Sequence, residues 1–419
     1  MSNFVILGGV KLEGNIKING SKNAAVALIS ASLLTNEECT LYNVPKIDDV
    51  EILVEIIEKL GVDIKWTNKS TLKIKASQIK KEKLDDALTR KLRASILLMG
   101  PLMGRIGKMK MVHPGGCVLG KRPVGTHFDA LRKLGAKISQ DSQYYYLETI
   151  KIKGARFYLT EKSVTATENA IMAAVLASGK TTILNAAVER HVIALCQFLN
   201  KMGAKISGAG SHTITIQGTE KLGGTEFVIP DDELEVGSFI ALALATKSKI
   251  NLKGNDFSDL EPITHKAFEF GAKIKVKNNI LTINPNNKMK ATSLKCYPWP
   301  GFPTDLIPQF TIVATQSSGI SLVHEWMYER RLSYLDELIK MGANITPCDP
   351  HRALVYGPTK LYGTTIVSPD IRAGMALVIA GLVAEGKTVI NNIEIIERGY
   401  YKLEERLRGI GANIKRINA

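Results

Sequence analysis

Lys59-Leu60-Gly61-Val62 is the first of six closely similar phrases along this chain of 419 residues. The other five are Lys133-Leu134-Gly135-Ala136, Lys201-Met202-Gly203-Ala204, Phe270-Gly271-Ala272, Lys340-Met341-Gly342-Ala343 and Ile410-Gly411-Ala412. By subtraction of neighbouring positions, their glycines lie 74, 68, 68, 71 and 69 residues apart. A nearly fixed period indicates repeated supersecondary units. The sequence therefore predicts six copies of one structural unit.

Each glycine follows a segment with the pattern of an amphipathic helix. In the first copy Val50, Leu53 and Ile57 mark one face at helical spacing. Glu51 and Glu55 stand on the opposite face. A glycine directly after such a segment suits the left-handed conformation that ends many helices. We therefore expect a surface helix that ends at the glycine in each copy, followed by a β-hairpin.

A second helix in each copy is apolar nearly all round. A helix without a polar face belongs in the interior of a protein. The six segments of this kind are 24–34, 94–103, 170–177, 239–245, 306–314 and 373–384. Each repeat is therefore expected to contribute one buried helix, one surface helix and several strands.

The two ends of the chain indicate how the copies are grouped. The last copy stops before its hairpin is complete, whereas spare strand-like residues, 4–7 and 14–18, precede the first copy. The simplest closure places these N-terminal strands in the C-terminal domain. We therefore expect an α/β protein with two similar three-repeat domains, residues 20–229 and residues 1–19 with 230–419. The active site is expected in the cleft between them.

Composition and charge limit the function classes. Apolar residues make up 45% of the chain and charged residues 23%, which favours a packed core over disorder. The 55 lysines and arginines outnumber the 40 acidic residues, and a net charge of +15 suits nucleic acid, anionic lipid or small anionic substrates. Most lysines are scattered, so we expect them to form an ordinary solvated surface. Nucleic-acid binding is the alternative from another class, although the chain lacks an aromatic and basic stripe.

Other patterns bear on compartment and cofactors. The longest apolar runs, such as 375–384, are too short to cross a bilayer, which takes about 18 residues, and the N-terminus lacks the pattern of a secretion signal. Five cysteines without paired short spacing favour a reducing compartment. The histidines show no metal-ligand spacing, and no P-loop is present. We therefore expect a cytoplasmic enzyme without a metal or other cofactor, and neither a membrane nor nucleic acid as a partner.

Polar residues open the apolar helices at equivalent places in the six copies. They are Lys22 and Asn23, Arg93, Glu168 and Asn169, Glu235, Asp305, and Asp370 with Arg372. A helix N-terminus carries unpaired N–H groups and a partial positive charge, so it attracts anions. The cations Lys22, Arg93 and Arg372 oppose this charge unless an anion is present. We therefore expect them to bind an anionic substrate.

Ordinary helix capping is the competing explanation for some of these positions. Ser21, Thr304 and Asp370 carry side chains that commonly cap helices. Capping explains their side-chain oxygens, but it does not explain the cations beside them.

A glycine-rich stretch, Pro114-Gly115-Gly116-Cys117-Val118-Leu119-Gly120-Lys121-Arg122-Pro123, lies in the second copy. Cys117 stands close to Lys121 and Arg122, and neighbouring cations lower the pKa of a thiol and make it reactive. The longer spacing of this copy fits an inserted functional loop. A lone cysteine is also often a small buried hydrophobe, as we expect of Cys39 and Cys196. Cys117 is therefore either a functional or a structural thiol.

A second stiff stretch is Pro298-Trp299-Pro300-Gly301-Phe302-Pro303-Thr304-Asp305. Its prolines restrict the approach to a helix that we expect to begin at Asp305. A rigidly held carboxylate suits a general base. The alternative is a carboxylate that merely stabilises the helix N-terminus.

These motifs together make the sequence similar to the enolpyruvyl transferase family over essentially its whole length. The shared stretches are 20–25, 93–95, 114–117, 122–124, 166–169, 300–305 and 397–400. The family member that acts on shikimate 3-phosphate resembles this fold but lacks the Pro-Gly-Gly-Cys loop. The resemblance implies an inside-out α/β barrel architecture: two domains, each of three βαβαββ units around buried parallel helices. It also implies that the N-terminal strands belong to the second domain.

The resemblance implies a reaction as well. The 3-hydroxyl of UDP-N-acetylglucosamine would add to C2 of phosphoenolpyruvate, C3 would be protonated, and phosphate would be eliminated, as the first committed step of peptidoglycan synthesis. Asp305 would take the hydroxyl proton. Cys117 would act as general acid at C3 or assist product release, with covalent addition to phosphoenolpyruvate as a further possibility.

The resemblance extends to the substrate-binding residues. The cations expected around phosphoenolpyruvate are Lys22, Arg122 and Arg398, with Arg93, Arg331 and Arg372 completing the basic shell. Lys22 and Arg398 are also expected to take part in catalysis. The residues expected to contact the sugar nucleotide or complete the site are Asn23, Ser163, Asp305, Met327 and Asp370, with Arg122, Pro123, Val124, Gly125 and Thr126 near the uridine end.

The chain departs from the family pattern on the expected nucleotide surface. Gly125 and Thr126 stand where the family usually has an acidic residue and a bulkier apolar one, and Thr165 replaces a usual glycine. The remaining departures are Arg330 and Tyr334 in place of a common Asn and His, and a 230–235 stretch that is one residue longer than usual. These changes keep an enolpyruvyl transferase with a different UDP-sugar acceptor as the second enzyme hypothesis.

Overall fold

The structure, a computed structural model, describes residues 2–115, 119–120 and 122–418. The chain divides into two compact units. The C-terminal unit is built from the described residues of 1–19, 118–121 and 231–419, and the N-terminal unit from those of 20–117 and 122–230.

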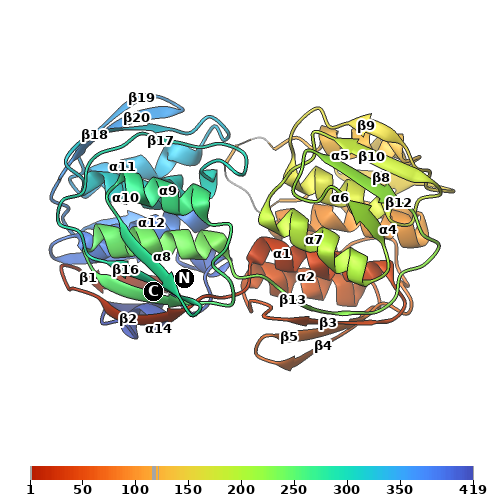
Figure 1. Cartoon of the computed structure of the whole chain (residues 1–419), viewed down its shortest axis with the longest axis horizontal. Helices are drawn as coiled ribbons and strands as arrows, with labels where there is room; N and C mark the ends of the chain where they lie inside the picture. The colour runs from red at the N-terminus through yellow and green to blue at the C-terminus, as the bar shows by residue number, and fades with distance from the viewer. Residues whose placement is uncertain (1, 116–118, 121, 419) are drawn as a thin grey trace. The chain divides into compact units, whose positions relative to one another are not determined.

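Three helices form the core of the C-terminal unit (Figure 1). They are α8 (Glu233–Ala245), α10 (Ile307–Thr315) and α12 (Ile371–Val383). Every residue of α8 is buried, as expected for a helix with no polar face. The outer helices are α9 (Glu261–Glu269), α11 (Leu335–Lys340), α13 (Glu394–Glu397) and α14 (Leu403–Arg408), with 3-10 helices η3 (Thr304–Leu306) and η4 (Arg331–Tyr334).

Three four-stranded sheets cover these helices. The first has the order β21 (Thr365–Val367), β22 (Lys387–Asn391), β1 (Ser2–Leu7) and β23 (Asn413–Asn418). The second has the order β15 (Lys273–Lys277), β16 (Ile280–Asn284), β14 (Lys249–Lys253) and β2 (Glu13–Lys17). The third has the order β17 (Leu294–Lys295), β18 (Gly319–His324), β20 (Arg352–Gly357) and β19 (Ile345–Asp349).

The N-terminal strands complete two of these sheets. Strand β1 lies antiparallel between β22 and β23, and Phe4 pairs with Ile390 on one side and with Arg416 on the other. Strand β2 lies parallel to β14 at the edge of the second sheet. The last repeat therefore receives from the start of the chain the strand that its own hairpin lacks.

The N-terminal unit repeats the same plan. Its core helices are α1 (Lys22–Ala31), α4 (Met99–Ile106) and α6 (Val164–Ala174), with 3-10 helices η1 (Ser32–Leu34) and η2 (Arg93–Leu98). Its outer helices are α2 (Asp48–Lys59), α3 (Asp86–Lys91), α5 (Gly125–Lys133) and α7 (Arg190–Lys201). The predicted six-repeat α/β architecture is therefore confirmed.

The sheets of this unit follow the repeat as well. One has the order β13 (Glu226–Val228), β3 (Glu38–Tyr42), β5 (Thr71–Lys75) and β4 (Asp63–Asn68). Another has the order β11 (Lys205–Ser207), β12 (Thr213–Gln217), β10 (Lys180–Leu184) and β9 (Arg156–Tyr158). The third has three strands, β6 (Lys108–Val112), β8 (Tyr144–Glu148) and β7 (Lys137–Gln140), and an isolated parallel bridge from Lys83 to Lys110 extends it.

The repeat glycines end the outer helices as predicted. Gly61 has a φ of 97° and Gly411 a φ of 95°, and the other four repeat glycines also have positive φ. A side chain is strained in this conformation, so glycine is the residue that ends a helix here with least cost.

The second buried helix begins later than predicted. The sequence pattern predicts a helix over 94–103, but residues 93–98 form the 3-10 helix η2 and the α-helix α4 runs from Met99 to Ile106. Pro101 explains the difference, because proline is accepted in the first turn of an α-helix but not in its interior. The helix expected to begin at Asp305 likewise opens with a 3-10 turn, and α10 begins at Ile307.

Candidate active site

The C-terminal unit holds Asp305 between two arginines. The Arg331 Nη2 atom donates a hydrogen bond to Asp305 Oδ1 at 2.7 Å, and the Arg372 Nε atom donates to Asp305 Oδ2 at 3.1 Å. The Asp305 side chain retains 29% exposure, whereas those of Arg331 and Arg372 retain 2% and 5%. The carboxylate is therefore fixed by buried cations and still reachable from solvent.

Asp370 joins this cluster from the N-terminus of α12. Its carboxylate accepts hydrogen bonds from the N–H groups of Arg372 and Ala373, so it caps the helix. The same carboxylate lies 3.6 Å from Arg331 Nη1. Burial alone would lower the pKa of Arg331, but the carboxylates of Asp305 and Asp370 raise it above the ordinary value. Both arginines therefore remain charged although they are buried.

Two donors and one acceptor of this cluster have no hydrogen-bond partner among the described residues. Within the described part of the chain, no hydrogen bond is made by Arg331 Nε, Arg372 Nη1 or Asp370 Oδ2, and all three atoms are buried. A buried polar group without a partner costs roughly 1–3 kcal/mol. Of these groups, the guanidinium N–H donors Arg331 Nε and Arg372 Nη1 are suited to bind an anion.

Arg398 precedes Gly399, whose backbone packs against the start of α12. It follows α13 directly and is half-buried. A Cβ atom on the next residue, Gly399, would lie 2.5 Å from Ile371 Cγ2 and 3.8 Å from Arg372 Nη1. The backbone after Arg398 therefore packs closely on the start of α12. Tyr400 lies beneath Arg372, whose guanidinium carbon is 5.4 Å from the ring centre.

Glu325 connects Met327 to the segment that carries Asp305. Its carboxylate accepts hydrogen bonds from the N–H groups of Met327 at 2.9 Å and Tyr328 at 3.2 Å. It also accepts the hydroxyl hydrogen of Thr304 at 2.5 Å. Thr304 is therefore not a helix cap, unlike Asp370. Glu325 was not predicted as a site residue, although a carboxylate directly after the strand β18 was a signal for it.

The departures around Arg331 differ in their surroundings. Tyr334 is fully buried, and its hydroxyl lies 2.8 Å from Thr311 Oγ1 on α10. Arg330 is exposed, and its backbone N–H donates a hydrogen bond to the backbone carbonyl of Leu119 at 3.3 Å. Tyr334 is therefore a core residue of the C-terminal unit, and Arg330 lies on its surface.

In the N-terminal unit, Lys22 makes an ion pair. Its Nζ atom lies 3.1 Å from Asp49 Oδ2, and the two side chains are 16% and 6% exposed. Ser21 caps α1 by accepting a hydrogen bond from the Ala24 N–H at 3.4 Å. The cation at this helix N-terminus is therefore balanced by a carboxylate of the protein itself. Asp49 was not predicted, because it comes from another helix, α2.

Arg93 links the two ends of the glycine-rich stretch. Its Nη2 atom donates to the carbonyl of Arg122 at 2.6 Å, and its Nη1 atom donates to that of Pro114 at 3.4 Å. A Cβ atom at Gly115 would lie 2.0 Å from the carbonyl oxygen of Arg90, so the chain requires glycine there. Cys117, the predicted functional thiol, lies outside the described residues.

A buried histidine organises the predicted nucleotide surface. His127 Nδ1 lies 2.9 Å from Asn169 Nδ2, an N–H donor, so Nδ1 accepts. The Nε2 atom then carries the hydrogen and lies 3.0 Å from Thr165 Oγ1. Burial, reinforced by the charges of Arg93 and Arg122, lowers the pKa of His127 to about 3. Thr165, which replaces the usual family glycine, therefore accepts a hydrogen bond from a neutral imidazole.

The other residues predicted to contact the nucleotide in this unit include Ser163 and residues 123–126. Ser163 caps α6, accepting a hydrogen bond from the Ala166 N–H at 3.4 Å. Val124 and Thr126 are both buried, whereas Pro123 and Gly125 are exposed. A Cβ atom at Gly125 would meet nothing within 4 Å. The acidic residue usual at this position in the family would therefore fit without a clash.

Glu168 is a buried carboxyl group in the same unit. It is 2% exposed, and its Oε1 atom lies 3.9 Å from His191 Nε2. Burial, with a contribution from the charge of Glu189, raises its pKa well above the ordinary value. Glu168 therefore keeps its proton to a higher pH than an exposed glutamate does.

The structure brings some of the predicted residues into contact and leaves others apart. Asp305, Arg331, Asp370 and Arg372 form one cluster, and the Arg93 guanidinium contacts the backbone of Arg122. Lys22 and Asn23 lie in the first turn of α1, and both are half-buried. Among the described residues, no group of three or more His, Cys, Asp or Glu side chains is arranged to hold a metal ion.

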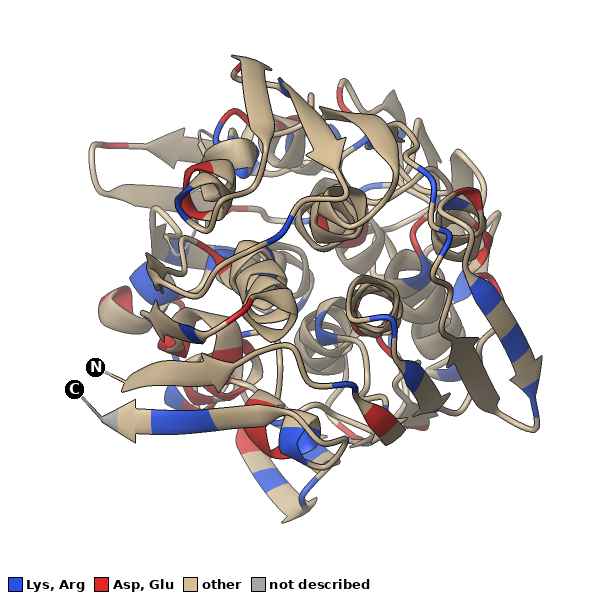
Figure 2. Ribbon diagram, turned by 90° about the vertical axis from the view of Figure 1, so that its left-hand side faces the viewer, with Lys and Arg blue, Asp and Glu red and all other residues tan. Residues whose placement is uncertain are grey.

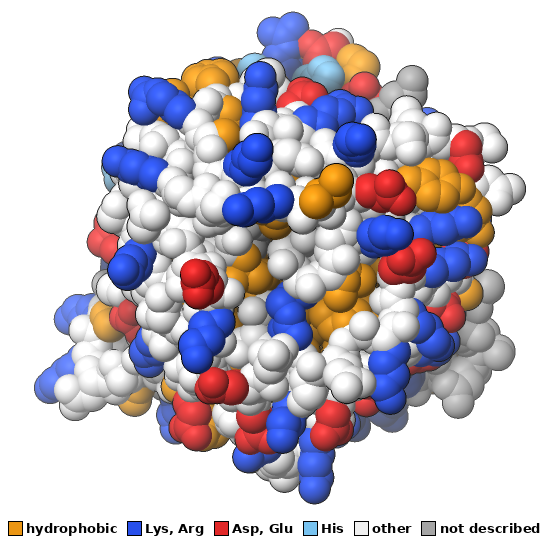
Figure 3. All heavy atoms as spheres, turned by 90° about the vertical axis from the view of Figure 1, so that its right-hand side faces the viewer, with side chains coloured by type: hydrophobic (Ala, Val, Ile, Leu, Met, Phe, Trp, Pro, Cys, Tyr) orange, Lys and Arg blue, Asp and Glu red, His pale blue; other side chains and the backbone are white. Residues whose placement is uncertain are grey.

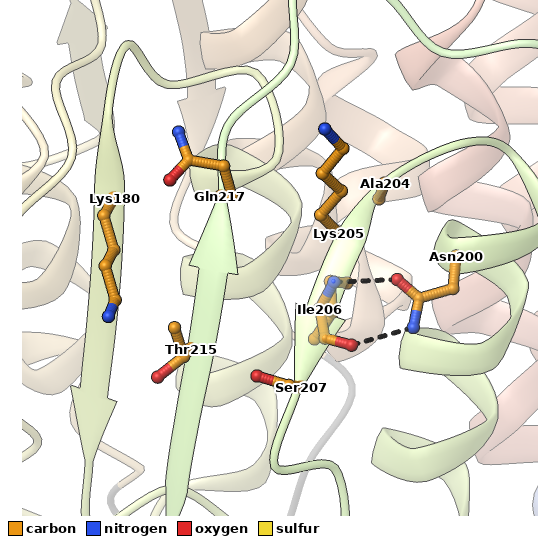
Figure 4. Close-up of a pocket in the computed structure, with 8 residues that line it drawn as sticks. All are labelled: Lys180, Asn200, Ala204, Lys205, Ile206, Ser207, Thr215 and Gln217. Atoms are coloured by element: carbon orange, nitrogen blue, oxygen red, sulfur yellow. Dashed lines mark hydrogen bonds between the residues drawn. The ribbon is translucent and has the colours of Figure 1, made fainter.

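A hollow on the β11–β12–β10–β9 sheet is distinct from these clusters (Figure 4). It is lined by Lys180, Asn200, Ala204, Lys205, Ile206, Ser207, Thr215 and Gln217. Asn200 uses its amide to hold Ile206, with hydrogen bonds of 2.8 and 2.9 Å to its backbone N–H and carbonyl. The predicted site residues do not line this hollow.

The fold and the clustered cations define the class of protein. The family model described as EPSP synthase (3-phosphoshikimate 1-carboxyvinyltransferase) matches residues 6–407. The chain therefore belongs to this family of enolpyruvyl transferases. Within the family it is similar over its full length to proteins named UDP-N-acetylglucosamine 1-carboxyvinyltransferase. The one from Treponema denticola is 44% identical, with 99% of each chain covered, and the one from Borreliella burgdorferi is 44% identical, with 100% of each covered.

Solved structures with the same fold are described as an enolpyruvyl transferase and as EPSP synthase. The enolpyruvyl transferase NikO from Streptomyces tendae has a TM-score of 0.92 at 21% identity, with 100% of this chain and 99% of that chain covered. EPSP synthase from Acinetobacter baumannii has a TM-score of 0.78 at 19% identity, with all of both chains covered. At this identity the likeness establishes the fold alone. None of the described helices is long and apolar enough to span a membrane.

Proposed function

We propose that this chain transfers the enolpyruvyl group of phosphoenolpyruvate to the 3-hydroxyl of UDP-N-acetylglucosamine and releases phosphate. The observation that carries the proposal is the Asp305 cluster, in which buried guanidinium donors of Arg331 and Arg372 lack a protein partner. The relatives named as transferases of this kind match the whole chain. Both substrates of the proposed reaction, the enolpyruvyl donor and the sugar acceptor, are inferred from the similarity to these relatives.

The chemistry assigns Asp305 the role of general base. Its carboxylate takes the hydrogen of the sugar hydroxyl, whose oxygen forms a bond to C2 of phosphoenolpyruvate while C3 receives a proton. The tetrahedral intermediate then loses phosphate and a proton from C3, which forms the vinyl ether. The proton lost from C3 offsets the one that C3 received in the addition. A carboxylate that two guanidinium groups hold in place suits this step, because a base must be oriented before it acts.

The cations stabilise the negative charge of the reacting groups. Arg331 and Arg372 supply fixed positive charge around Asp305, and Arg398, which precedes the glycine packed on the start of α12, is proposed to add to it. Such charges act strongly because they require no reorganisation during the reaction. In the N-terminal unit, Lys22, Arg93 and Arg122 are proposed to bind the phosphate and carboxylate of phosphoenolpyruvate. The proposal requires the cations of both units to act on one pair of substrates, in a site lined by residues of both.

Cys117 is proposed to deliver the proton to C3 or to assist product release. The proposal rests on its place between Pro114-Gly115-Gly116 and the cations Lys121 and Arg122 in the sequence. Asn23, Ser163 and Met327 are proposed to contact the sugar nucleotide, with residues 122–126 near its uridine end. The proposed cellular role is the first committed step of peptidoglycan synthesis in the cytoplasm.

A different UDP-sugar acceptor is the second candidate. The observation in its favour is Thr165, whose hydroxyl accepts from His127 on the surface proposed for uridine. A panel of UDP-sugars, each incubated with phosphoenolpyruvate, separates the two candidates by the rate of phosphate release. The highest kcat/KM with UDP-N-acetylglucosamine supports the first. A clear preference for another sugar overturns the acceptor and leaves enolpyruvyl transfer standing.

Cys117→Ser tests the role of the thiol in the same assay. A loss of turnover, with a loss of inactivation by a thiol-reactive epoxide, is expected. Unchanged turnover and unchanged sensitivity to the epoxide would show that the thiol is structural.

A further inference from the structure

The sheet β2–β14–β16–β15 of the C-terminal unit has a strongly basic outer face. Side chains alternate between the two faces of a strand, and the buried residues Ile250 and Leu252 of β14 mark the inner face. The outer face carries six exposed lysines, which are Lys17, Lys249, Lys253, Lys273, Lys275 and Lys277. We call this surface the lysine face. Glu13 is the one acidic side chain that the described strands place on it.

The register of the sheet brings like charges together. Lys253 pairs with Lys17 on β2 and with Ile280 on β16, and Ile280 pairs with Lys277 on β15. This row therefore holds three lysines and no acid. None of the six lysines makes an ion pair within the described part of the chain. Like charges opposite each other on a sheet are destabilising, so the face costs stability unless an anion covers it.

The corresponding sheet of the other unit is electrically balanced. In β13–β3–β5–β4, Lys75 pairs with Glu38 on one side and with Asp63 on the other. Lys73 makes an ion pair with Glu38 at 2.7 Å. Figure 3, which views the chain from the side of this unit, shows basic side chains interspersed with acidic ones. The fold itself therefore does not require a basic face.

The lysine face differs from that sheet at an equivalent position of the repeat. Lys273 stands two residues after Gly271, as Asp63 stands two residues after Gly61. Lys273 pairs with Asn284 on β16, and Lys249 pairs with Glu13 on β2. Where the other unit places an acid, Asp63, opposite a base, Lys75, this unit places a base, Lys273, opposite an amide, Asn284. Figure 2, which views the chain from the side of the C-terminal unit, shows basic bands alternating along a strand.

We propose that the lysine face docks the protein onto the surface of an anionic phospholipid bilayer. The four strands and the four-residue span from Lys273 to Lys277 give a face of about 14 Å by 14 Å, from strand spacings of about 4.8 Å and rises of about 3.4 Å per residue. A face of this size covers several lipid headgroups. Clusters of four to eight basic residues, about the number present here, are typical of surfaces that bind anionic lipid.

The chemistry of the face favours lipid over nucleic acid. The described strands place no arginine or aromatic side chain on it, so it offers neither bidentate phosphate contacts nor a surface on which bases stack. Lysines act here as hydrated point charges, which suits a fluid array of phosphates. The proposal revises the expectation that no membrane is a partner. That expectation rested on the absence of a segment that spans a bilayer, and this is a surface association.

Flotation with lipid vesicles tests the proposal with the full-length protein. We expect binding to vesicles of phosphatidylcholine mixed with phosphatidylglycerol and none to phosphatidylcholine alone. The triple variant K273Q/K275Q/K277Q should bind about 100-fold more weakly, since each lysine near an anionic bilayer contributes about fivefold. Binding should also fall with added salt, because salt screens these charges.

The matched control removes the same number of lysines from the balanced sheet. K65Q/K73Q/K75Q should bind the mixed vesicles as the unmodified protein does. A second test variant, K273E, places an acid where the other unit carries Asp63, and it should also weaken binding. Equal losses in test and control variants, or no binding to the mixed vesicles, overturn the proposal. Tighter binding to a DNA duplex than to the vesicles overturns it in favour of nucleic acid.

Discussion

Arg331 and Asp305 form a hydrogen-bonded ion pair of 2.7 Å in which the arginine is almost fully buried and the carboxylate is partly exposed. Arg331 thus holds Oδ1 of the carboxylate and Arg372 holds Oδ2, while the Asp305 side chain keeps 29% of its surface exposed. This is the arrangement that an oriented general base requires. Predictions about turnover and stability follow from this pair and from the buried titratable groups.

Arg331→Met should impair both stability and turnover. The variant leaves Asp305 and Asp370 without the cation that lies 2.7 Å from one and 3.6 Å from the other. Removal of one partner of a buried ion pair costs about 3 kcal/mol, which urea unfolding will measure. Arg331→Lys keeps the charge but loses the planar fork, so it should recover stability more than turnover. Equal turnover in the two variants would contradict the orienting role.

Thr165→Ala should destabilise the N-terminal unit. It removes the oxygen that accepts the Nε2–H hydrogen bond of His127. A buried donor left without a partner costs about 1–3 kcal/mol. Thr165→Ser keeps the hydroxyl and serves as the control, and it should remain within about 0.5 kcal/mol of the unmodified protein. Loss of stability in both variants would show that the methyl group, and not the hydrogen bond, is responsible.

His127 should make the protein less stable in acid. The pKa of His127 is about 3 in the folded protein, against an ordinary value of 6.5. The unfolded chain therefore binds a proton that the folded protein excludes, and stability falls as the pH is lowered from 6.5 towards 3. The slope due to this group is about 1.4 kcal/mol per pH unit. His127→Gln should flatten the acid limb of the stability curve, and an unchanged slope would contradict the assignment.

Glu168 should make the protein less stable as the pH rises above the ordinary pKa of a glutamate. Because burial raises the pKa of Glu168, the folded protein keeps a proton that the unfolded chain loses, and stability falls as the pH rises above about 4.5. Glu168→Gln removes this decline, so the variant should be more stable than the unmodified protein near neutral pH. Glu220→Gln, at an exposed position, is the control and should leave the curve unchanged. A variant that is less stable at neutral pH would show that Glu168 is ionised there, in a pair with His191.

Most of the fold could be predicted from the repeat pattern. The six glycines and the apolar helices are local signals, because a helix end and a buried helix each depend on residues adjacent in sequence. Pro101 was visible in the same sequence, and it should have moved the start of the second buried helix. The pairing of β1 with β22 and β23 joins the two ends of the chain. It was predicted only because the last repeat lacked a strand.

The site was predicted less completely than the fold. Lys22, Arg93 and Arg372 could be predicted as site residues because a cation at a helix N-terminus opposes the helix dipole, and such a position can be recognised from the sequence. Their carboxylate partners were not visible in this way. Asp49 reaches Lys22 from another helix, and Glu325 ties Met327 to Thr304 across 21 residues of sequence. Partners that depend on tertiary packing leave no periodic signal.

Phosphate release by the purified protein tests the central claim most directly. The protein is incubated with phosphoenolpyruvate alone, with UDP-N-acetylglucosamine alone, and with both. The account predicts phosphate release that requires both substrates and is lost in Asp305→Asn. Release at the same rate from phosphoenolpyruvate alone would contradict enolpyruvyl transfer. A full rate in Asp305→Asn would contradict the role of the carboxylate that Arg331 and Arg372 hold.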